Sequence, residues 1–247
     1  MEMVISMKII IADAKKLKVQ QHPLNKQVPL FNDKSQKLLS ILKSMNETQL
    51  HDLLKISFQQ SKQLYKDLKE QNTYAALNLF DGLVYKQLHL DQYNNQQLNY
   101  LNHHLLINSP VYGLLRPQDQ IEKHRLEISH HPHHINLYDY WHQDIQHYLK
   151  DEDMIISLST KEYEKMIEHP RMITIDFQEV SGDTIKRRAT YLKKARGQML
   201  DYLIRHQVRD VEQIKTIIID DYQYNDQLST SQHFVFQRQL QMKYIKR

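Results

Sequence analysis

The sequence predicts a single-domain α+β fold in which helices surround a mixed sheet. Short runs of β-branched and other apolar residues alternate along the chain with longer segments of helical periodicity. A hairpin signal, Ser181-Gly182-Asp183, joins two strand-like runs, so an antiparallel pair is expected. No Pro-rich or Gly/Ser-rich linker divides the 247 residues. We therefore treat 1–247 as one domain, with 1–6 as a candidate N-terminal extension and 239–247 as a tail.

In the first half of the chain, a strand precedes a long helical region. Residues 8–12 (KIIIA) form the continuous apolar run that is typical of a buried strand. Residues 32 to about 71 keep helical spacing, and Asn46 with Gln49 predicts a capping box inside that run. Further along we expect a short helical piece that ends near 80–82, a helix over 92–104 and a buried segment at 105–107.

The second half of the chain predicts alternating helices and strands. Leu137, Trp141 and Ile145 share one face of a helix over 137–149. Ser159 and Glu162 predict a second capping box, for a helix through 167. The other expected elements are a strand at 154–159, the hairpin of 171–180 with 184–191, a helix at 192–206, an N-cap at Asp210 with Gln213, and strands at 216–220 and 233–238.

Composition restricts the chemistry and the location of the protein. The chain has no cysteine, which excludes disulfides, thiolate catalysis and Cys-ligated metal sites, and we expect no cofactor. The formal net charge of +4 permits an acidic partner, although local clustering must provide the attraction. The apolar stretch from Ile9 to Ala12 is too short for a signal peptide or a membrane span, so we expect a cytoplasmic protein without a membrane partner.

The strongest local signal is a basic run, KRRATYLKKAR, at 186–196. It could contact successive phosphates of a nucleic acid, with Tyr191 available for stacking; a solvated basic face is the alternative. Gly197 follows inside a helical segment, where glycine costs about 1 kcal/mol relative to alanine, so we expect a close neighbour there. The basic residues of the run are Lys186, Arg187, Arg188, Lys193, Lys194 and Arg196.

Other polar clusters leave several interpretations open. Four histidines at 130–134 surround Pro132 without the spacing of a known metal site, so we expect an exposed loop and no metal. Arg125 and Glu127 share a face of an extended segment, where they could pair with each other or bind one ligand. Glu162, beside Tyr163, could serve the helix N-terminus or a ligand.

The segment SPVYGLLRPQD (109–119) contains one of only four glycines in the chain. Gly113 lies inside an apolar run that stops at Arg116-Pro117. From these residues alone we expect a turn between two buried runs, or a place where the backbone approaches a phosphate or substrate.

Taken together and in order, seven short motifs resemble the YaaA family of bacterial proteins, which is associated with the peroxide-stress response. The resemblance extends from about Met7 to Arg238. Its motifs are KIIIADAK (8–15), FDGLVY (80–85), SPVYGLLRPQD (109–119), HRLE (124–127), LYDYW (137–141), SLSTKEY (157–163) and YLKKARG (191–197).

This resemblance implies a YaaA-type fold with a helix-hairpin-helix-like element, a basic cleft and binding of duplex DNA. It also implies protection of DNA and of iron balance under oxidative stress. By position, Lys193, Lys194 and Arg196 would line the cleft, and Tyr112, Gly113 and Arg116 would belong to the hairpin element. The chain departs from the family pattern at Ala12-Asp13, Pro110 and Ser157, where the family usually has Ser-Pro, a glycine and an asparagine. Pro110 removes one amide donor from the expected phosphate contact.

Three functions follow as hypotheses. The first is a DNA-binding protein that contacts phosphates through the basic run and the hairpin segment. The second is an enzyme that acts on nucleic acid or nucleotides, with Lys15, Arg125, Glu127 and Glu162 as candidate catalytic residues. The third is direct iron handling by the histidine-rich loop or by carboxylates. A shared pocket for these side chains favours catalysis, whereas their spread along a basic groove favours binding.

Overall fold

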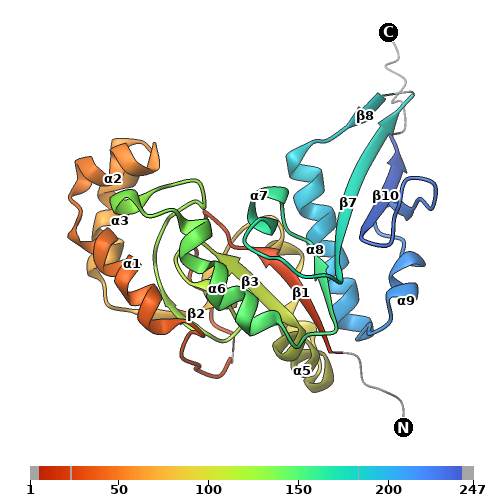
Figure 1. Ribbon diagram of the computed structural model, residues 1–247, viewed down its shortest axis with the longest axis horizontal. Coiled ribbons are helices and arrows are strands. Elements are labelled where there is room, and N and C mark those ends of the chain that lie inside the picture. Colours follow the sequence, from red (N-terminus) through yellow and green to blue (C-terminus); the bar gives the residue numbers. More distant parts are fainter. Residues whose placement is uncertain (1–5, 23, 183, 241–247) are drawn as a thin grey trace.

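The computed structural model describes residues 6–22, 24–182 and 184–240, and its centre is an eight-stranded mixed sheet (Figure 1). Five neighbouring strands are parallel: β3 (Leu105–Ser109), β1 (Met7–Ala12), β6 (Met154–Ser157), β7 (Met172–Ser181) and β10 (His233–Gln239). Antiparallel strands complete the sheet, namely β4 (Gly113–Leu115), β8 (Thr184–Lys186) and β9 (Gln223–Tyr224). This arrangement confirms the predicted mixed sheet with surrounding helices.

Strand β1 lies in the middle of the sheet and carries much of the core. Ile9, Ile10 and Ile11 are fully buried. Ile9 is in register with Leu105 on one side and with Ile156 on the other. A strand that is covered on both faces needs apolar side chains at successive positions, which is the pattern that predicted it.

The order of the strands places a crevice at the carboxyl end of β1. From β1 the chain first enters β3 on one side and only later β6 on the other side. Such a position, where successive connections from one strand go to opposite sides, is called a topological switch point. Ligands of open parallel sheets bind there, because the connections leave the strand ends in opposite directions and open a crevice between them. A second, two-stranded sheet of β2 (Thr73–Ala75) and β5 (Gln120–Glu122) lies outside this arrangement.

The long helical run predicted over 32–71 is three helices, which Figure 1 shows grouped at one end of the molecule. They are α1 (Asn32–Ser44), α2 (Glu47–Leu54) and α3 (Phe58–Lys69). The Asn46 capping box is present, but it begins a new helix. Lys55 then takes a left-handed conformation with φ 52°, and Ser57 begins α3 with a capping box of its own. Two local caps therefore interrupt a periodicity that continues through all three helices.

The SPVYGLLRPQD segment forms the β3–β4 hairpin, so the helix-hairpin-helix-like element is not confirmed there. Gly113 has φ +69°, and a Cβ on it would lie 2.8 Å from Trp141 Cε3 and 2.9 Å from Phe31 Cδ2. Trp141 also donates from Nε1 to the Pro110 carbonyl at 2.8 Å. Both the backbone conformation and the close packing therefore require glycine at this position.

Gly197 serves another close approach, between α8 (Ala189–His206) and the turn before η1 (Tyr85–Gln87). A Cβ at Gly197 would lie 2.3 Å from the carbonyl oxygen of Val84. The close neighbour expected at this glycine is thus the backbone of the FDGLVY segment. This contact brings the basic helix next to the FDGLVY segment.

The other helices agree with the predictions with a few corrections. As expected, α6 (Leu137–Leu149) is a helix, whereas α5 (Asn95–His104) begins three residues later than predicted, after the Asn94 cap. The short helices are α4 (Ala76–Leu79), η2 (Leu90–Gln92), η3 (Pro132–His134), α7 (Lys161–Glu164) and α9 (Val211–Lys215). The Ser159 capping box is wrong, because Thr160 is the N-cap of α7 and α7 ends at Glu164.

The predicted strand at 216–220 is also wrong. Ile217 and Ile219 are buried, but only Ile219 forms a bridge, to Tyr222. Their apolar side chains fill the core from an irregular segment, which periodicity alone cannot distinguish from a strand. The proposed extension and tail lie largely outside the described residues, and Gln239 still belongs to β10. No helix in the described ranges is long and apolar enough to cross a membrane.

Candidate active site

A pocket of about 370 Å³ lies at the carboxyl ends of β1 and β6, where the strand order places the crevice. We call it the strand-end pocket. Its walls come from the residues after β1, the FDGLVY segment, Glu127, the residues after β6, and α8. Its ionisable side chains are Asp13, Lys15, Lys16, Glu127, Glu162, Tyr163, Lys193, Arg196 and Tyr85.

Asp13 is the first polar residue after β1 and lies in the pocket. Its backbone N–H donates to the Asn108 carbonyl at 3.0 Å, which extends the pairing of β1 with β3 by one residue. The Tyr163 hydroxyl donates to Asp13 Oδ1 at 3.0 Å. Desolvation raises the pKa of the Asp13 carboxyl to about 7, against the opposing effect of the Tyr163 hydroxyl. Asp13 therefore exchanges its proton near neutral pH.

Tyr163 is held in place by the strand next to β1. Asn108 donates from Nδ2 to the Tyr163 carbonyl at 3.0 Å, which fixes the short helix α7 against β3. Burial and the neighbouring Asp13 raise the pKa of Tyr163, so its hydroxyl keeps its proton and donates to the carboxylate. Glu162, one residue earlier, is exposed at the edge of the pocket.

Lys15 and Glu127 form an ion pair across the pocket. Lys15 Nζ lies 2.6 Å from Glu127 Oε2, and the lysine is 59% exposed. The Glu127 backbone N–H donates to His130 Nδ1 at 3.0 Å, so the first histidine of the histidine-rich segment holds the backbone of Glu127 in place. Lys15, Glu127 and Glu162, which the sequence marked as candidates, share one pocket.

Helix α8 brings two cations to the pocket, Lys193 and Arg196. Lys193 is exposed, whereas Arg196 is half-buried and its Nε has no hydrogen-bond partner in the described residues. Burial lowers the pKa of Arg196, but an arginine stays charged at neutral pH. A half-buried guanidinium at the wall of the pocket is suited to hold an anionic group of a ligand.

The other predicted catalytic and hairpin residues lie outside the strand-end pocket. Arg125 is half-buried and does not line it. Arg116 donates from Nε to Asp119 Oδ1 at 2.9 Å and from Nη2 to the Val28 carbonyl at 2.6 Å. Tyr112 is buried, and its hydroxyl accepts from the Glu122 N–H at 2.9 Å. Because Tyr112 and Gly113 are both buried, we leave them out of any DNA-contacting surface.

The basic run contains side chains with an ion-pair partner and side chains without one in the described residues. Arg187 pairs with Asp176 at 2.7 Å, and Arg188 binds the buried Glu179 through two hydrogen bonds of 2.8 and 2.7 Å. Exposed Lys186, Lys193 and Lys194 form no ion pair with any residue that the structure describes. Sequence alone could not separate the two groups, because the carboxylates lie on a different strand.

Sequence reasoning missed Asp13 as a site residue and treated it only as a departure from a family pattern. A usable signal was present, since polar residues directly follow two buried parallel-strand runs, at Asp13 and at Ser159. Regarding metals, the described residues contain no group of three or more His, Cys, Asp or Glu side chains that could hold an ion.

These features define a class of protein: a mixed α and β fold with an ionisable pocket at a strand-order switch, next to a basic helix. Residues 7–228 match the family model described as peroxide stress protein YaaA. The chain belongs to this family.

Curated relatives extend over nearly the whole chain. The chain is 31% identical to the UPF0246 protein FN1762 of Fusobacterium nucleatum, over 94% of this chain and 99% of the relative. It is 34% identical to a UPF0246 protein of Finegoldia magna, over 95% and 99% of the two chains. A UPF0246 protein of Lactobacillus helveticus is 32% identical, over 96% and 99%.

Proposed function

We propose that the strand-end pocket is the active site of an enzyme that acts on nucleic acid or nucleotides during peroxide stress. One observation carries this proposal: residues from five distant parts of the chain gather their ionisable groups in one pocket. Lys15 and Glu127 pair there at 2.6 Å, beside a carboxyl group at Asp13 whose pKa is near neutral. Such perturbed groups in a cleft are typical of acid–base sites.

The side chains divide naturally between binding and proton transfer. Arg196 and Lys193 hold the anionic part of the substrate, because both are cations at the wall formed by α8. Asp13 exchanges a proton with the substrate, and the Tyr163 hydroxyl fixes the orientation of its carboxyl group through the 3.0 Å hydrogen bond. Glu127, which pairs with Lys15 at 2.6 Å, can accept a second proton or orient a water molecule.

Product formation tests this proposal. Purified protein is incubated with nucleotides and with duplex DNA that carries oxidised bases, and the products are identified by mass spectrometry. We expect a new product with the wild type and a rate about 10²- to 10⁴-fold lower with Glu127→Gln, the usual range for a group that transfers a proton. Glu168→Gln, at an exposed glutamate outside the pocket, is the matched control and should act like the wild type. Equal rates for all three proteins, or no product from any substrate, would contradict the proposal.

A second candidate function is binding of duplex DNA through its phosphates, in a cytoplasmic role that protects DNA from peroxide and excess iron. Lys186, Lys193 and Lys194 favour it, because they are exposed on β8 and α8 and Lys193 also lines the strand-end pocket. These three lysines would carry most of the phosphate contacts, since Arg187 and Arg188 are already paired with carboxylates. DNA bound there would lie across the opening of the pocket.

The salt dependence of DNA affinity measures this second function. Fluorescence anisotropy with a labelled duplex should show a slope of log affinity against log salt of about −2.7 if three lysines contact phosphates. Lys194→Gln should reduce the slope by about one, and reversing the charge of all three lysines should abolish binding at low salt. Lys37→Gln, on α1 at the other end of the molecule, should leave the slope unchanged. DNA binding that survives the triple reversal would exclude this surface.

A further inference from the structure

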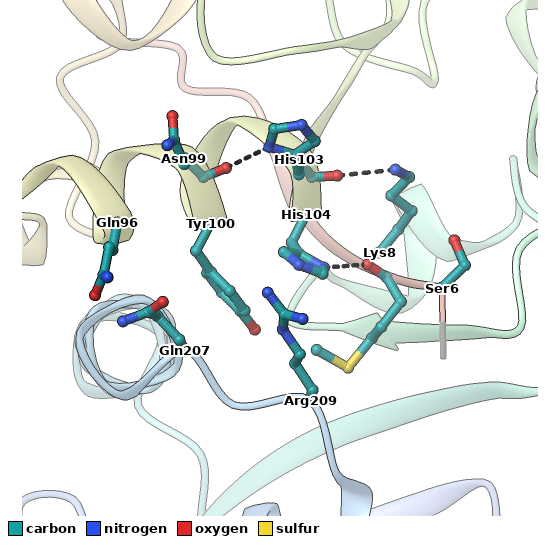
Figure 2. Close-up of a pocket in the computed structure, with 10 residues that line it drawn as sticks. Ser6, Lys8, Gln96, Asn99, Tyr100, His103, His104, Gln207 and Arg209 are labelled. Atoms are coloured by element: carbon teal, nitrogen blue, oxygen red, sulfur yellow. Dashed lines mark hydrogen bonds between the residues drawn. The ribbon is translucent and has the colours of Figure 1, made fainter. Parts of the chain in front are cut away.

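A second cavity lies at the amino end of β1, at the opposite end of the central strands from the strand-end pocket. It has a volume of about 580 Å³ and is bounded by the start of β1, by α5 and by the residues that follow α8 (Figure 2). We call it the basal pocket. It takes no part in the proposed active site, because β1 separates its amino-end residues Met7 and Lys8 from Asp13 at the carboxyl end.

The basal pocket is cationic. Lys8 and Arg209 line it, and none of its lining residues within the described ranges is an acid. Lys8 donates to the His103 carbonyl at 2.8 Å and lies 3.4 Å from Glu152, so its charge is partly compensated. Arg209 forms no ion pair or side-chain hydrogen bond with any described residue. A cavity with an uncompensated guanidinium attracts an anion.

The position of Arg209 is set by contacts between two helices. Gln207 ends α8 in a left-handed conformation with φ 50°, which turns the chain back toward α5. The Tyr100 hydroxyl then donates to the Val208 carbonyl, and Val208 is buried. Figure 2 shows the Arg209 guanidinium directed toward His104 and Tyr100 inside the pocket. The arginine is therefore held at the cavity by the packing of the residue before it.

Two histidines line the cavity in orientations that their hydrogen bonds fix. His104 Nδ1 lies 2.6 Å from the Met7 carbonyl, and His103 Nδ1 lies 2.7 Å from the Asn99 carbonyl. A carbonyl oxygen can only accept, so each Nδ1 carries a proton. The His104 ring also stacks on Tyr100, with ring centroids 4.1 Å apart. Burial lowers the pKa of His104, so its ring is neutral at pH 7 and accepts a hydrogen bond from a ligand.

We propose that the basal pocket binds a small phosphate-bearing molecule of nucleotide size. Arg209 and Lys8 contact the phosphate, and His104 accepts a hydrogen bond from a hydroxyl group of the ligand. The amide side chains of Gln96, Asn99 and Gln207 line the same cavity and can both donate to and accept from a sugar or base. A guanidinium binds two phosphate oxygens at once, which favours phosphate over a single negative charge.

Calorimetric titration of the full chain with AMP and with adenosine tests this site. We expect AMP to bind and adenosine, which lacks the phosphate, to bind at least tenfold more weakly. Arg209→Gln should weaken AMP binding roughly tenfold to a hundredfold, the effect of losing a hydrogen-bonded charge. Arg187→Gln removes the same charge at an exposed arginine that does not line the basal pocket, and it serves as the matched control.

Two comparisons decide whether the binding belongs to the basal pocket. Lys193→Gln alters the strand-end pocket, and the binding that depends on Arg209 should survive it. If Lys193→Gln abolishes AMP binding while Arg209→Gln has no effect, AMP binds at the strand-end pocket and the present proposal is wrong. Absence of AMP binding by the wild type at millimolar concentration, or equal binding of adenosine, would also overturn it.

Discussion

Glu179→Gln is expected to lower the free energy of unfolding by about 3 kcal/mol, because it removes the buried carboxylate that Arg188 and Arg238 share and leaves the largely buried Arg238 with only Asp220, at 2.6 Å, as a counter-charge. Glu179 is fully buried at the end of β7. It accepts two hydrogen bonds from Arg188 and one of 2.8 Å from Arg238, whose side chain is only 10% exposed. Urea unfolding at pH 7, followed by circular dichroism, measures the change.

The hydrogen bonds with Arg188, followed by those with Arg238, lower the pKa of Glu179. Its contribution to stability is therefore present above the ordinary glutamate pKa and is lost as the pH falls through the lower, folded-state value. Glu212→Gln is the matched control, because Glu212 pairs with Lys215 at 2.7 Å but is 71% exposed. We expect little change from it, since water screens an exposed pair. Equal losses in the two variants would show that Glu179 and its arginines are not a structural network.

Asp13→Asn is expected to make the protein more stable and less active. Burial raises the pKa of Asp13 to about 7, so ionising this carboxyl in the folded state costs up to about 4 kcal/mol. The stabilising contribution of the protonated form is complete below pH 3.8 and is lost progressively as the pH rises to about 7. Asparagine has no charge to desolvate and still accepts the Tyr163 hydroxyl. The gain in unfolding free energy should therefore be larger at pH 8 than at pH 5.

The activity of the same variant completes the test. If Asp13 transfers the proton, the wild-type rate should change with an inflection near pH 7, and Asp13→Asn should lose both the inflection and about 10²- to 10⁴-fold in rate. A more stable variant with unchanged activity would remove Asp13 from the proposed mechanism. A less stable variant would show that its carboxylate is a structural group.

Asp81→Asn is expected to change the free energy of unfolding in the opposite direction. It therefore controls for the general effect of replacing a buried aspartate by asparagine. Asp81 is also buried, but it pairs with Lys16 at 2.8 Å, and this hydrogen bond lowers its pKa. Its contribution to stability is present above the ordinary aspartate pKa and is lost as the pH falls. Asp81→Asn should therefore destabilise the protein at pH 8, where Asp13→Asn stabilises it.

Local sequence patterns correctly predicted the elements whose conformation follows from residues close together in the chain. The Ile9–Ile11 strand, the helix around Trp141 and the antiparallel pairing of β7 with β8 were confirmed. The second hairpin arm, predicted over 184–191, ends at Lys186, and residues 189–191 belong to α8. The prediction was wrong at 216–220, where the bridge between Ile219 and Tyr222 replaces a strand. Apolar composition indicates burial there, whereas strand formation requires a neighbouring strand with open hydrogen-bonding groups.

The candidate site was only partly predictable. Lys15, Glu127 and Glu162 were candidates from sequence, and the fold brings them into one pocket. Asp13 was not a candidate from sequence, and in the structure it is marked by desolvation, which raises its pKa. The basic run indicated six cations, but Asp176 and Glu179 on β7 neutralise two of them.

The sequence by itself determined the mixed α and β class, the central apolar strand and membership of a family whose motifs are spread over the chain. Only the tertiary structure decided what each special residue does. Gly113 makes room for Trp141 and Phe31, and Gly197 makes room for the Val84 carbonyl. The physical reason is that secondary structure and burial follow from neighbours in the chain, whereas pKa, ion pairing and pocket formation depend on groups that folding brings together from distant positions.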